Sequence, residues 1–507
     1  MGARWLAAAV VAASFFWMLG AAPLFDVDEG AFSQATLEMF QRGDFLSTYL
    51  NGAPRYDKPI LVYWLQAAAV ALLGPTEWAF RLPSAICASL WAWLTYLFAK
   101  RHFGEERALL AAVLLATSIG VHIIGRAATA DALLNLLLAA SMFCAWRHLA
   151  SGRRGWLYAT HAAIGLGFLA KGPIAILVPG ATTLLFCLFK RDLRAWLRAV
   201  FDWRALLLFL VIAAPWYAVI LAKEGWAFVQ GFFFKHNLAR FGGPLQGHGG
   251  SLLYYFPVVL LLSLPHTALL VPVAARLREV WRDELQAYLL LWFAFVFVFF
   301  SLSGTKLPHY VLYGYTGAAL LMAVHGPAIR SARWALAPAL AFFLVLLFLP
   351  NLIAHFAPRL PDAYYRQALG ALLPDFGLAY FAYFGILAAL VVYAMLERRT
   401  PLARKQALVG LLGVAGFATF VVPAAGGLQA PVREAALLAR QHGFDVVMWK
   451  LNAPSFSVYR GAPTPSRDPR PGDVIVTRAS RLPDLPKGTT YDILFSRGGI
   501  VLARIKA

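Results

Sequence analysis

The sequence has few charged residues, and acidic ones are especially scarce. Lys, Arg, Asp and Glu make up 14% of its 507 residues, whereas soluble globular chains carry about 25%. Hydrophobic residues make up 60%, and the mean hydropathy is +0.65. These values exclude an ordinary soluble protein and predict a polytopic α-helical membrane protein.

Cysteine is also scarce. Cys87, Cys144 and Cys187 all lie inside apolar runs, so no disulfide framework is predicted and the redox compartment stays open. No internal repeat or low-complexity tract is evident. The net charge of +20 would indicate a polyanionic partner in a soluble protein. Membrane proteins concentrate Lys and Arg in cytoplasmic loops, so we expect membrane lipids, and no nucleic acid, as partners.

Apolar segments run through most of the chain. A membrane-spanning helix needs about 20 mostly apolar residues, and about thirteen segments qualify, starting near residues 4, 82, 107, 130, 155, 173, 203, 252, 285, 308, 334, 376 and 405. The first resembles a signal peptide in its small residues, but it is long, and we interpret it as an uncleaved helix. With the N-terminus in the cytoplasm, basic loops such as residues 100–107 and 398–405 follow the positive-inside rule.

The C-terminal part has a different character. Residues 1–424 form the predicted membrane domain, and residues 425–507 a small soluble α/β domain on the external, periplasmic face. "REAALLARQHG" predicts a helix, and "FDVVMWK", "GDVIVTR", "YDILFSR" and "GIVLARIK" predict short strands. No catalytic motif is evident in this tail.

An acidic cluster follows the first apolar segment. "FDVDEGAFSQ", residues 25–34, contains Asp26, Asp28 and Glu29 and opens an external loop of residues 25–81. In this loop "EGAFSQATLEMF" and "PILVYWLQAAAVALLG" predict helices lying on the membrane surface, with Phe32, Leu37 and Phe40 toward the bilayer. "RYDKP" lies between them.

Other ionisable residues fall on the same predicted face. Ionisable groups at membrane depth are costly and are functional candidates by default. Simpler interpretations exist: Lys171 could extend to the headgroups, Asp131 could cap a helix, and His248 could be an ordinary loop residue. Their occurrence in several separate connections favours one shared site. These residues are Arg126, Asp131, Lys171, Lys235, His236, Arg240, His248, Lys306, His309 and Tyr310.

Such a set of residues suits a lipid-linked phosphate. Cations bind a phosphate and stabilise it as a leaving group. A carboxylate acts as a general base on a hydroxyl or binds a divalent metal. The predicted reaction is therefore group transfer from a lipid-linked donor, without a nucleotide cofactor.

The motifs resemble a known family. "DVDEGAFSQATLEM", "YDKP", "FLAKGP", "HNLARF" with "HGG" and "LYYF", and "SGTKLPHY" follow the order seen in GT-C superfamily membrane glycosyltransferases. Over essentially the whole chain, they resemble the bacterial lipid A 4-amino-4-deoxy-L-arabinose transferases, relatives of the protein O-mannosyltransferases. The resemblance implies inverting transfer from undecaprenyl phosphate to a lipid A phosphate. It also implies a location at the periplasmic face of the inner membrane and resistance to polymyxin.

The resemblance also implies roles for individual residues. Asp28 matches the essential first-loop aspartate, and Asp131 matches a second site aspartate. Our own hypothesis from the acidic cluster is that Asp28 and Glu29 form part of a catalytic rim and that Asp26 is solvent-facing support. Lys58, Lys171, Lys306 and Tyr310 match cations and a tyrosine near the donor phosphate, and we add Arg126 to this donor-binding group as an ionisable residue of the same face. A metal, zinc by resemblance, would lie at Asp57 and His236.

The sequence departs from the family pattern at three positions. The Arg-Tyr pair that usually follows "DE" is Ala31 and Phe32 here, and the glutamate before the loop lysine is Asp57. The sugar and the acceptor therefore stay open. A protein Ser/Thr, or another glycan or lipid hydroxyl, is the alternative acceptor. A lipid-linked sugar flippase is disfavoured because the charges gather at one face rather than at the midplane.

Overall fold

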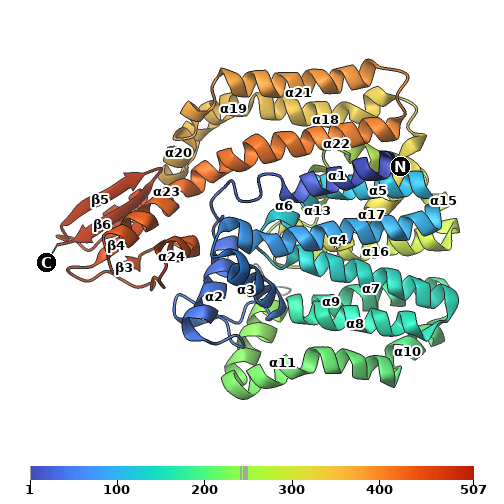
Figure 1. Ribbon diagram of the computed structural model, residues 1–507, viewed down its shortest axis with the longest axis horizontal. Coiled ribbons are helices and arrows are strands. Elements are labelled where there is room, and N and C mark those ends of the chain that lie inside the picture. The colour runs from blue at the N-terminus through green and yellow to red at the C-terminus, as the bar shows by residue number, and fades with distance from the viewer. Residues whose placement is uncertain (1, 240–242, 244–248, 507) are drawn as a thin grey trace.

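Helices form most of the computed structural model, which describes residues 2–239, 243 and 249–506 (Figure 1). Among these residues, six helices are long and apolar enough to cross a membrane: α4 (Glu77–Phe103), α7 (Asp131–Ser151), Trp203–His236 (α11 with most of η1), α16 (Glu284–Leu302), α21 (Leu378–Leu396) and Leu402–Gln441 (α22 to α23). Three bent pairs raise this number to nine: α5 (Glu105–Thr117) with α6 (Ile119–Arg126), α13 (Tyr255–Leu262) with Thr267–Ala275, and α18 (Ala332–Leu347) with Leu349–Arg359. The multi-pass helical class is confirmed, whereas the number thirteen stays a prediction.

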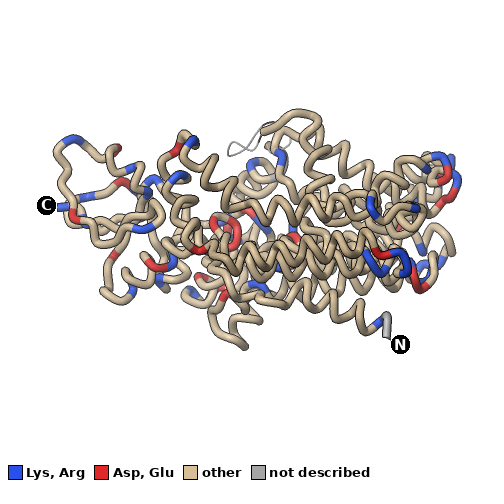
Figure 2. The backbone as a smooth tube through the Cα atoms, turned by 90° about the horizontal axis from the view of Figure 1, so that it is seen from above, with Lys and Arg blue, Asp and Glu red and all other residues tan. Residues whose placement is uncertain are grey.

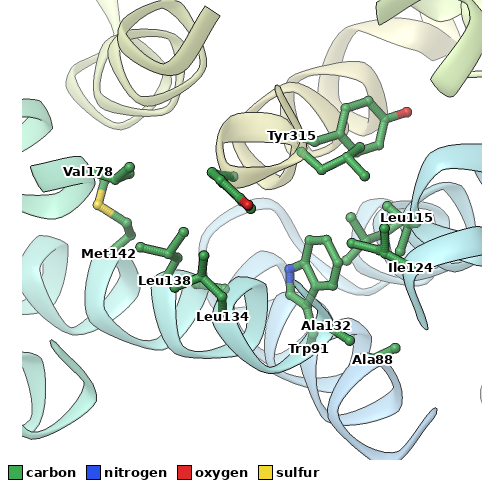
Figure 3. Packing of buried hydrophobic residues seen from close by; sticks show 14 of the residues in the cluster. Ala88, Trp91, Leu115, Ile124, Ala132, Leu134, Leu138, Met142, Val178 and Tyr315 are labelled. Carbon is green, nitrogen blue, oxygen red and sulfur yellow. The ribbon is translucent and has the colours of Figure 1, made fainter. Parts of the chain in front are cut away.

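Shorter helices complete the bundle. They are α1 (Gly2–Phe16), α8 (Arg154–Lys171), α9 (Ile174–Phe189), α10 (Leu193–Val200), α15 (Leu277–Arg282), α17 (Tyr315–His325) and α20 (Ala363–Gly370). The buried core lies where α4, α5, α7, α9, α16 and α17 meet. On α7, Leu134, Leu138 and Met142 lie four residues apart and therefore share one face, which points toward Val178 and Trp91 (Figure 3).

The predicted external loop contains two helices and a small hairpin. The helices are α2 (Asp28–Arg42) and α3 (Leu61–Leu73), and β1 (Tyr49–Leu50) pairs with β2 (Ala53–Pro54). Both predicted helices are present, but α2 is mostly buried in protein. Phe32 is 4% exposed and stacks on Tyr63 with ring centroids 5.3 Å apart, so it faces the protein rather than the bilayer as predicted.

The C-terminal part contains all four predicted strands. The sheet has the order β3-β4-β6-β5, in which β3 pairs with β4 in parallel and the other pairs are antiparallel. Its elements are α23 (Val422–Gln441), β3 (Val446–Met448), α24 (Pro454–Arg460), β4 (Val474–Arg478), β5 (Tyr491–Arg497) and β6 (Ile500–Ile505). Residue 425 falls inside α23, so one helix joins the bundle to the sheet without a linker (Figure 1). The predicted boundary stays a prediction.

Charged residues mark the two ends of the bundle. Figure 2 shows Lys, Arg, Asp and Glu gathered in the C-terminal part and the region that adjoins it, and again at the opposite end, with a mostly uncharged stretch before that end. This distribution is typical of a helical bundle that crosses a bilayer. Which end faces the cytoplasm stays a prediction.

Candidate active site

Two cavities, each of about 510 Å³, lie near the α2 end of the bundle. The first is mostly apolar, with its polar groups supplied by Asp57, Lys58, Lys171, His236, Ser303, Tyr310 and Tyr313. The second contains Asp26, Asp28, Glu29, Arg81, Arg126, Thr129, Asp131 and His309. Because Asp131 lines the second cavity while its partners Lys171 and Tyr313 line the first, the two cavities adjoin at this carboxylate.

Asp131 lies at the centre of a buried cluster. Its Oδ1 accepts hydrogen bonds from Lys171 Nζ at 2.5 Å and Tyr313 OH at 2.9 Å, and His309 Nε2 lies 3.6 Å away. Asp131 is the first residue of α7 and Lys171 the last of α8, so each charge lies at the helix end whose dipole favours it. Thr129 Oγ1 donates to the second carboxylate oxygen at 3.3 Å.

These contacts overturn the two simpler interpretations. Lys171 turns inward to Asp131 instead of extending to headgroups, and the Asp131 side chain makes no capping hydrogen bond among the described residues. Gly172 ends α8 with φ +78°, and a Cβ there would lie 2.5 Å from Phe232. The "KGP" string therefore needs glycine to turn the chain beside the site.

The first cavity holds a second charged cluster. His236 Nε2 lies 2.7 Å from Asp57 Oδ1, Arg55 Nη2 lies 3.3 Å from Asp57 Oδ2, and Lys58 Nζ donates to the Asp57 carbonyl at 3.0 Å. Burial alone would raise the pKa of Asp57, but His236 and Arg55 hold that pKa well below its usual range. Arg55, which sequence reasoning missed, also lies 5.4 Å over the Phe32 ring.

Asp57 and His236 do not make a preformed metal site. In the part of the chain that the structure describes, no three His, Cys, Asp or Glu side chains come together as ligands, whereas a protein zinc site takes three or four. A ligating imidazole normally donates its other N–H to a partner, but His236 Nδ1 has none among the described residues. Asp57 is also neutralised by Arg55. The described residues at Asp57 and His236 therefore do not fit a zinc ion.

The two predicted residues of "TKLPHY" take different places. Tyr310 lines the first cavity, with its ring 5.8 Å from Lys171 Nζ. Lys306 is buried and does not line the cavity. It donates to the carbonyl of Ser303, which does line the cavity. Tyr313 was missed, although a signal existed. Residues 308–314 form a 3₁₀ helix, in which positions three apart share a face, so Tyr313 accompanies Tyr310.

Arg126 lies apart from Lys58, Lys171 and Tyr310, with which the sequence grouped it as a donor-binding residue. It lines the second cavity, is 6% exposed, and donates from Nη1 to the Ser14 carbonyl at 3.3 Å. Its Nη2 has no partner among the described residues. Nη2 is itself enclosed by protein, whereas other atoms of Arg126 line the second cavity together with Asp28.

Glu29 does not form a catalytic rim with Asp28. It is 4% exposed, and its oxygens accept from Arg81 Nε at 2.9 Å, Arg81 Nη2 at 2.7 Å, Phe25 N at 2.9 Å and Ala128 N at 2.7 Å. Burial would raise the pKa of Glu29, but Arg81 and these N–H groups lower it instead. We assign Glu29 a positioning role. Arg81 was missed because its partner lies 52 positions away.

The prediction that Asp26 faces solvent is wrong. Asp26 accepts a hydrogen bond from Ser455 N at 2.9 Å and another from Ser455 Oγ, so it joins the loop to α24 of the C-terminal part. Burial raises the pKa of Asp26 to about 7, against the lowering effect of the Ser455 hydrogen bonds. Asp28, by contrast, is exposed in the second cavity and makes no ion pair among the described residues. Arg240 and His248 lie outside the described residues.

The arrangement suits group transfer between two amphipathic molecules. An apolar cavity with cations at its inner end accepts a lipid tail with an anionic head. The adjoining cavity offers an accessible carboxylate and an arginine to a second reactant. Holding two reactants side by side, with charge-stabilising groups at the junction, is the geometric requirement for displacement between them.

Known proteins resemble the chain in sequence and in structure. A family model described as dolichyl-phosphate-mannose-protein mannosyltransferase matches residues 57–218. An uncharacterized protein of Aquifex aeolicus is 31% identical over 306 residues, 60% of this chain and 68% of that protein. The undecaprenyl phosphate-alpha-4-amino-4-deoxy-L-arabinose arabinosyl transferase of Pseudomonas aeruginosa (strain UCBPP-PA14) is 32% identical over 307 residues, 58% of this chain and 54% of that protein.

The solved structures extend the likeness to the full length. ArnT from Cupriavidus metallidurans bound to undecaprenyl phosphate matches with a TM-score of 0.83 at 20% identity, covering 99% of this chain and 98% of that one. Its apo state matches with a TM-score of 0.81. The sequence matches span only about half of the named arabinosyl transferases, but they agree with the fold. The chain therefore belongs to the family of GT-C membrane glycosyltransferases that includes these arabinosyl transferases.

Proposed function

We propose that this protein transfers a sugar, 4-amino-4-deoxy-L-arabinose, from undecaprenyl phosphate to a phosphate of lipid A. The observation that carries the proposal is the pair of adjoining cavities that meet at Asp131, one apolar with cations and the other with Asp28 and Arg126. The names of the arabinosyl transferase relatives support this choice of donor and sugar.

The first cavity takes the donor. Phe233, Phe234, Phe299 and Phe300 line it and suit a polyprenyl tail, while Lys58 and Lys171 lie beside the phosphate. These cations stabilise the negative charge that grows on the phosphate as it leaves. Tyr310 lies at the same end of the cavity and donates from its hydroxyl to a phosphate oxygen. Because the donor is lipid-linked, no nucleotide cofactor takes part.

The second cavity takes the acceptor. Arg126 lines this cavity and supplies a positive charge beside the anionic acceptor group, and Asp28, the first residue of α2, lies in the same cavity. A lipid A phosphate is already ionised at neutral pH, so Asp28 does not need to remove a proton. It orients the reacting groups and accepts hydrogen bonds from the donor sugar. Asp131, held by Lys171 and Tyr313, fixes the junction between the two molecules.

The reaction is a single in-line displacement. An acceptor phosphate oxygen uses an electron pair to form a bond to the anomeric carbon, on the face opposite the leaving group. The bond between that carbon and the donor phosphate oxygen breaks, and its electron pair goes to undecaprenyl phosphate. The anomeric configuration is inverted, and no covalent enzyme intermediate or proton transfer is required. If the acceptor is a hydroxyl of a protein or a glycan, Asp28 takes its proton as general base.

The proposal places the reaction at the periplasmic face of a bacterial inner membrane. The basic residues of the opposite end then face the cytoplasm, in agreement with the positive-inside rule. Lipid A modified with an amino sugar carries less negative charge, so it binds cationic peptides such as polymyxin less strongly.

The test uses cells that lack this protein and the mass spectrum of their lipid A. Wild type, Asp28→Asn and the matched control Asp375→Asn, an exposed aspartate of the short 3₁₀ helix Leu373–Asp375, are expressed at equal levels. We expect wild type and the control to add a pentosamine mass and Asp28→Asn to lose at least about 100-fold of it. If lipid A stays unmodified in cells that express wild type, lipid A is rejected as the acceptor. Protein or glycan that carries the added sugar would then support the hydroxyl alternative.

A further inference from the structure

A third cavity, of about 360 Å³, lies at the end of the bundle remote from the active site. Its walls are the last turns of α7, the first half of α8, the first ten residues of α9 and the start of α11, and α10 closes one side. The lining is almost entirely apolar, with Leu157, Ile164, Ile176, Leu206 and Phe209 among its residues. An apolar cavity of this kind excludes water and accepts hydrocarbon.

The helix α10, Leu193–Val200, lies across this cavity as a surface helix. Trp196 anchors it to α9, because its Nε1 donates to the Gly180 carbonyl at 3.1 Å and to Thr183 Oγ1 at 3.2 Å. Leu193 and Leu197 share the apolar side of α10 with Trp196 by helical spacing and are exposed. Short amphipathic helices with exposed leucines and basic residues lie in the headgroup region of a bilayer. The cavity therefore opens at the level where phospholipid headgroups meet their chains.

The polar residues of α10 are cationic. Arg194 and Arg198 are exposed, and neither makes an ion pair among the residues that the structure describes. The nearby carboxylates are engaged elsewhere, since Asp192 caps α10 and Asp202 caps α11. Arginine binds phosphate through a fork of two N–H groups. By helical spacing both arginines lie on the side of α10 turned away from Trp196, where they are complementary to the headgroup of an anionic lipid whose acyl chain reaches beneath the helix.

We propose that this cavity binds one anionic glycerophospholipid. An acyl chain occupies the cavity beneath Trp196, and the headgroup phosphate lies on Arg194 and Arg198. The arginines give the headgroup preference, and the cavity gives the chain a fixed place that the surrounding bilayer lacks. This inference is independent of the sugar-transfer reaction, because none of these residues lines either cavity of the active site.

Native mass spectrometry of the full-length, delipidated protein tests the proposal. The probes are palmitoyl-oleoyl phosphatidylglycerol and the phosphatidylcholine with the same chains. We expect wild type to retain a single phosphatidylglycerol, with roughly tenfold preference over phosphatidylcholine, because each arginine near the headgroup contributes to anionic-lipid binding. In the double variant Arg194→Gln/Arg198→Gln we expect that preference to disappear. Both side chains are exposed, so this variant is expected to fold normally.

A pair of glycine variants tests the cavity itself. Gly180 lines the cavity, and a Cβ added to it would meet no heavy atom of the described residues within 4 Å. The same holds for Gly385 on α21, far from the cavity. We expect Gly180→Leu to lose the bound lipid and Gly385→Leu to keep it. Equal retention of the two lipids by wild type, or of phosphatidylglycerol by both leucine variants, would overturn the proposal. So would selective exclusion of undecaprenyl phosphate by Gly180→Leu, which would assign the cavity to the donor tail.

Discussion

Replacing Glu29 by glutamine tests whether this residue positions the site or reacts in it. In wild type the carboxylate accepts four hydrogen bonds, two of them from the Arg81 guanidinium, and both side chains are buried. Glutamine has the same shape but one acceptor oxygen fewer, so an amide N–H must face a donor. It also leaves Arg81 as a buried charge without a counter-ion. Removing one partner of a buried pair costs about 3–5 kcal/mol.

We expect Glu29→Gln to lower the stability of the protein first. With an unfolding entropy of about 2 cal/mol/K per residue, this cost lowers the midpoint of thermal unfolding by roughly 3–5 °C. The loop before α2 is tied to Arg81 through the carbonyls of Leu19, Ala22 and Pro23. We therefore expect transfer activity to fall together with stability, because Asp28 follows directly on this loop.

Thermal unfolding in detergent and transfer to lipid A are measured on the same preparations. The double variant Glu29→Leu/Arg81→Met removes both charges, and we expect it to be more stable than Glu29→Gln, since apolar replacement of a whole buried pair is often neutral. Its recovery is incomplete because the three carbonyls lose their donor, at about 1 kcal/mol each. If Glu29→Gln unfolds like wild type but loses transfer at least about 100-fold, the positioning role is refuted and Glu29 takes part in the chemistry.

Three further predictions rest on contacts of the same site. Tyr313→Phe removes one hydrogen bond to the Asp131 carboxylate, and such bonds contribute about 1.5–3 kcal/mol. We therefore expect kcat to fall about 10- to 100-fold while the protein level is unchanged. An unchanged kcat would contradict the role given to Asp131. Asp26 has its pKa raised to about 7, so its contribution to stability is complete below its unfolded pKa near 4 and is lost as the pH rises through 7. Unfolding midpoints of wild type should thus decline between about pH 4 and 7 more steeply than those of Asp26→Asn, and equal slopes would reject this assignment. Since Asp57 and His236 lack further ligands among the described residues, treatment with EDTA should change the transfer rate by less than about twofold; a larger loss that zinc restores would reinstate the metal.

Sequence patterns predicted what depends on local periodicity and composition. The four C-terminal strands and the two loop helices alternate or repeat at the spacing of their elements, so α2, α3 and β3 to β6 lie where expected. Lys171 and Asp131 stood out because isolated charges in apolar segments need partners. The structure shows that they are each other's partner, at 2.5 Å.

Long-range pairing was the part that local patterns could not supply. The sequence places Asp26, Asp28 and Glu29 within four positions, and nothing local distinguishes them. Their partners differ by tertiary position alone: Glu29 meets Arg81 from α4, and Asp26 meets Ser455 from the C-terminal part. Arg126 lies apart from Lys58 and Lys171 for the same reason: it ends α6, which is bent by 64° from α5, and it lines the second cavity.

The carboxylates of the loop identify Asp28 by elimination. Residues 25–60 contain six of them, and buried or half-buried carboxylates are normally satisfied by donors. Five have donors that fix the loop to another part of the fold or to itself: Asp26 to Ser455, Glu29 to Arg81, Glu38 to Asn51 and Gly52, Asp44 to Lys223, and Asp57 to His236. Asp28 makes no such contact among the described residues and is exposed in the second cavity. The five paired carboxylates hold the loop from several sides, so the sixth is presented in a fixed place with its oxygens available.

A group in that position has little to contribute to stability. We therefore expect Asp28→Asn to unfold like wild type, in contrast to Glu29→Gln, while its loss falls on transfer alone.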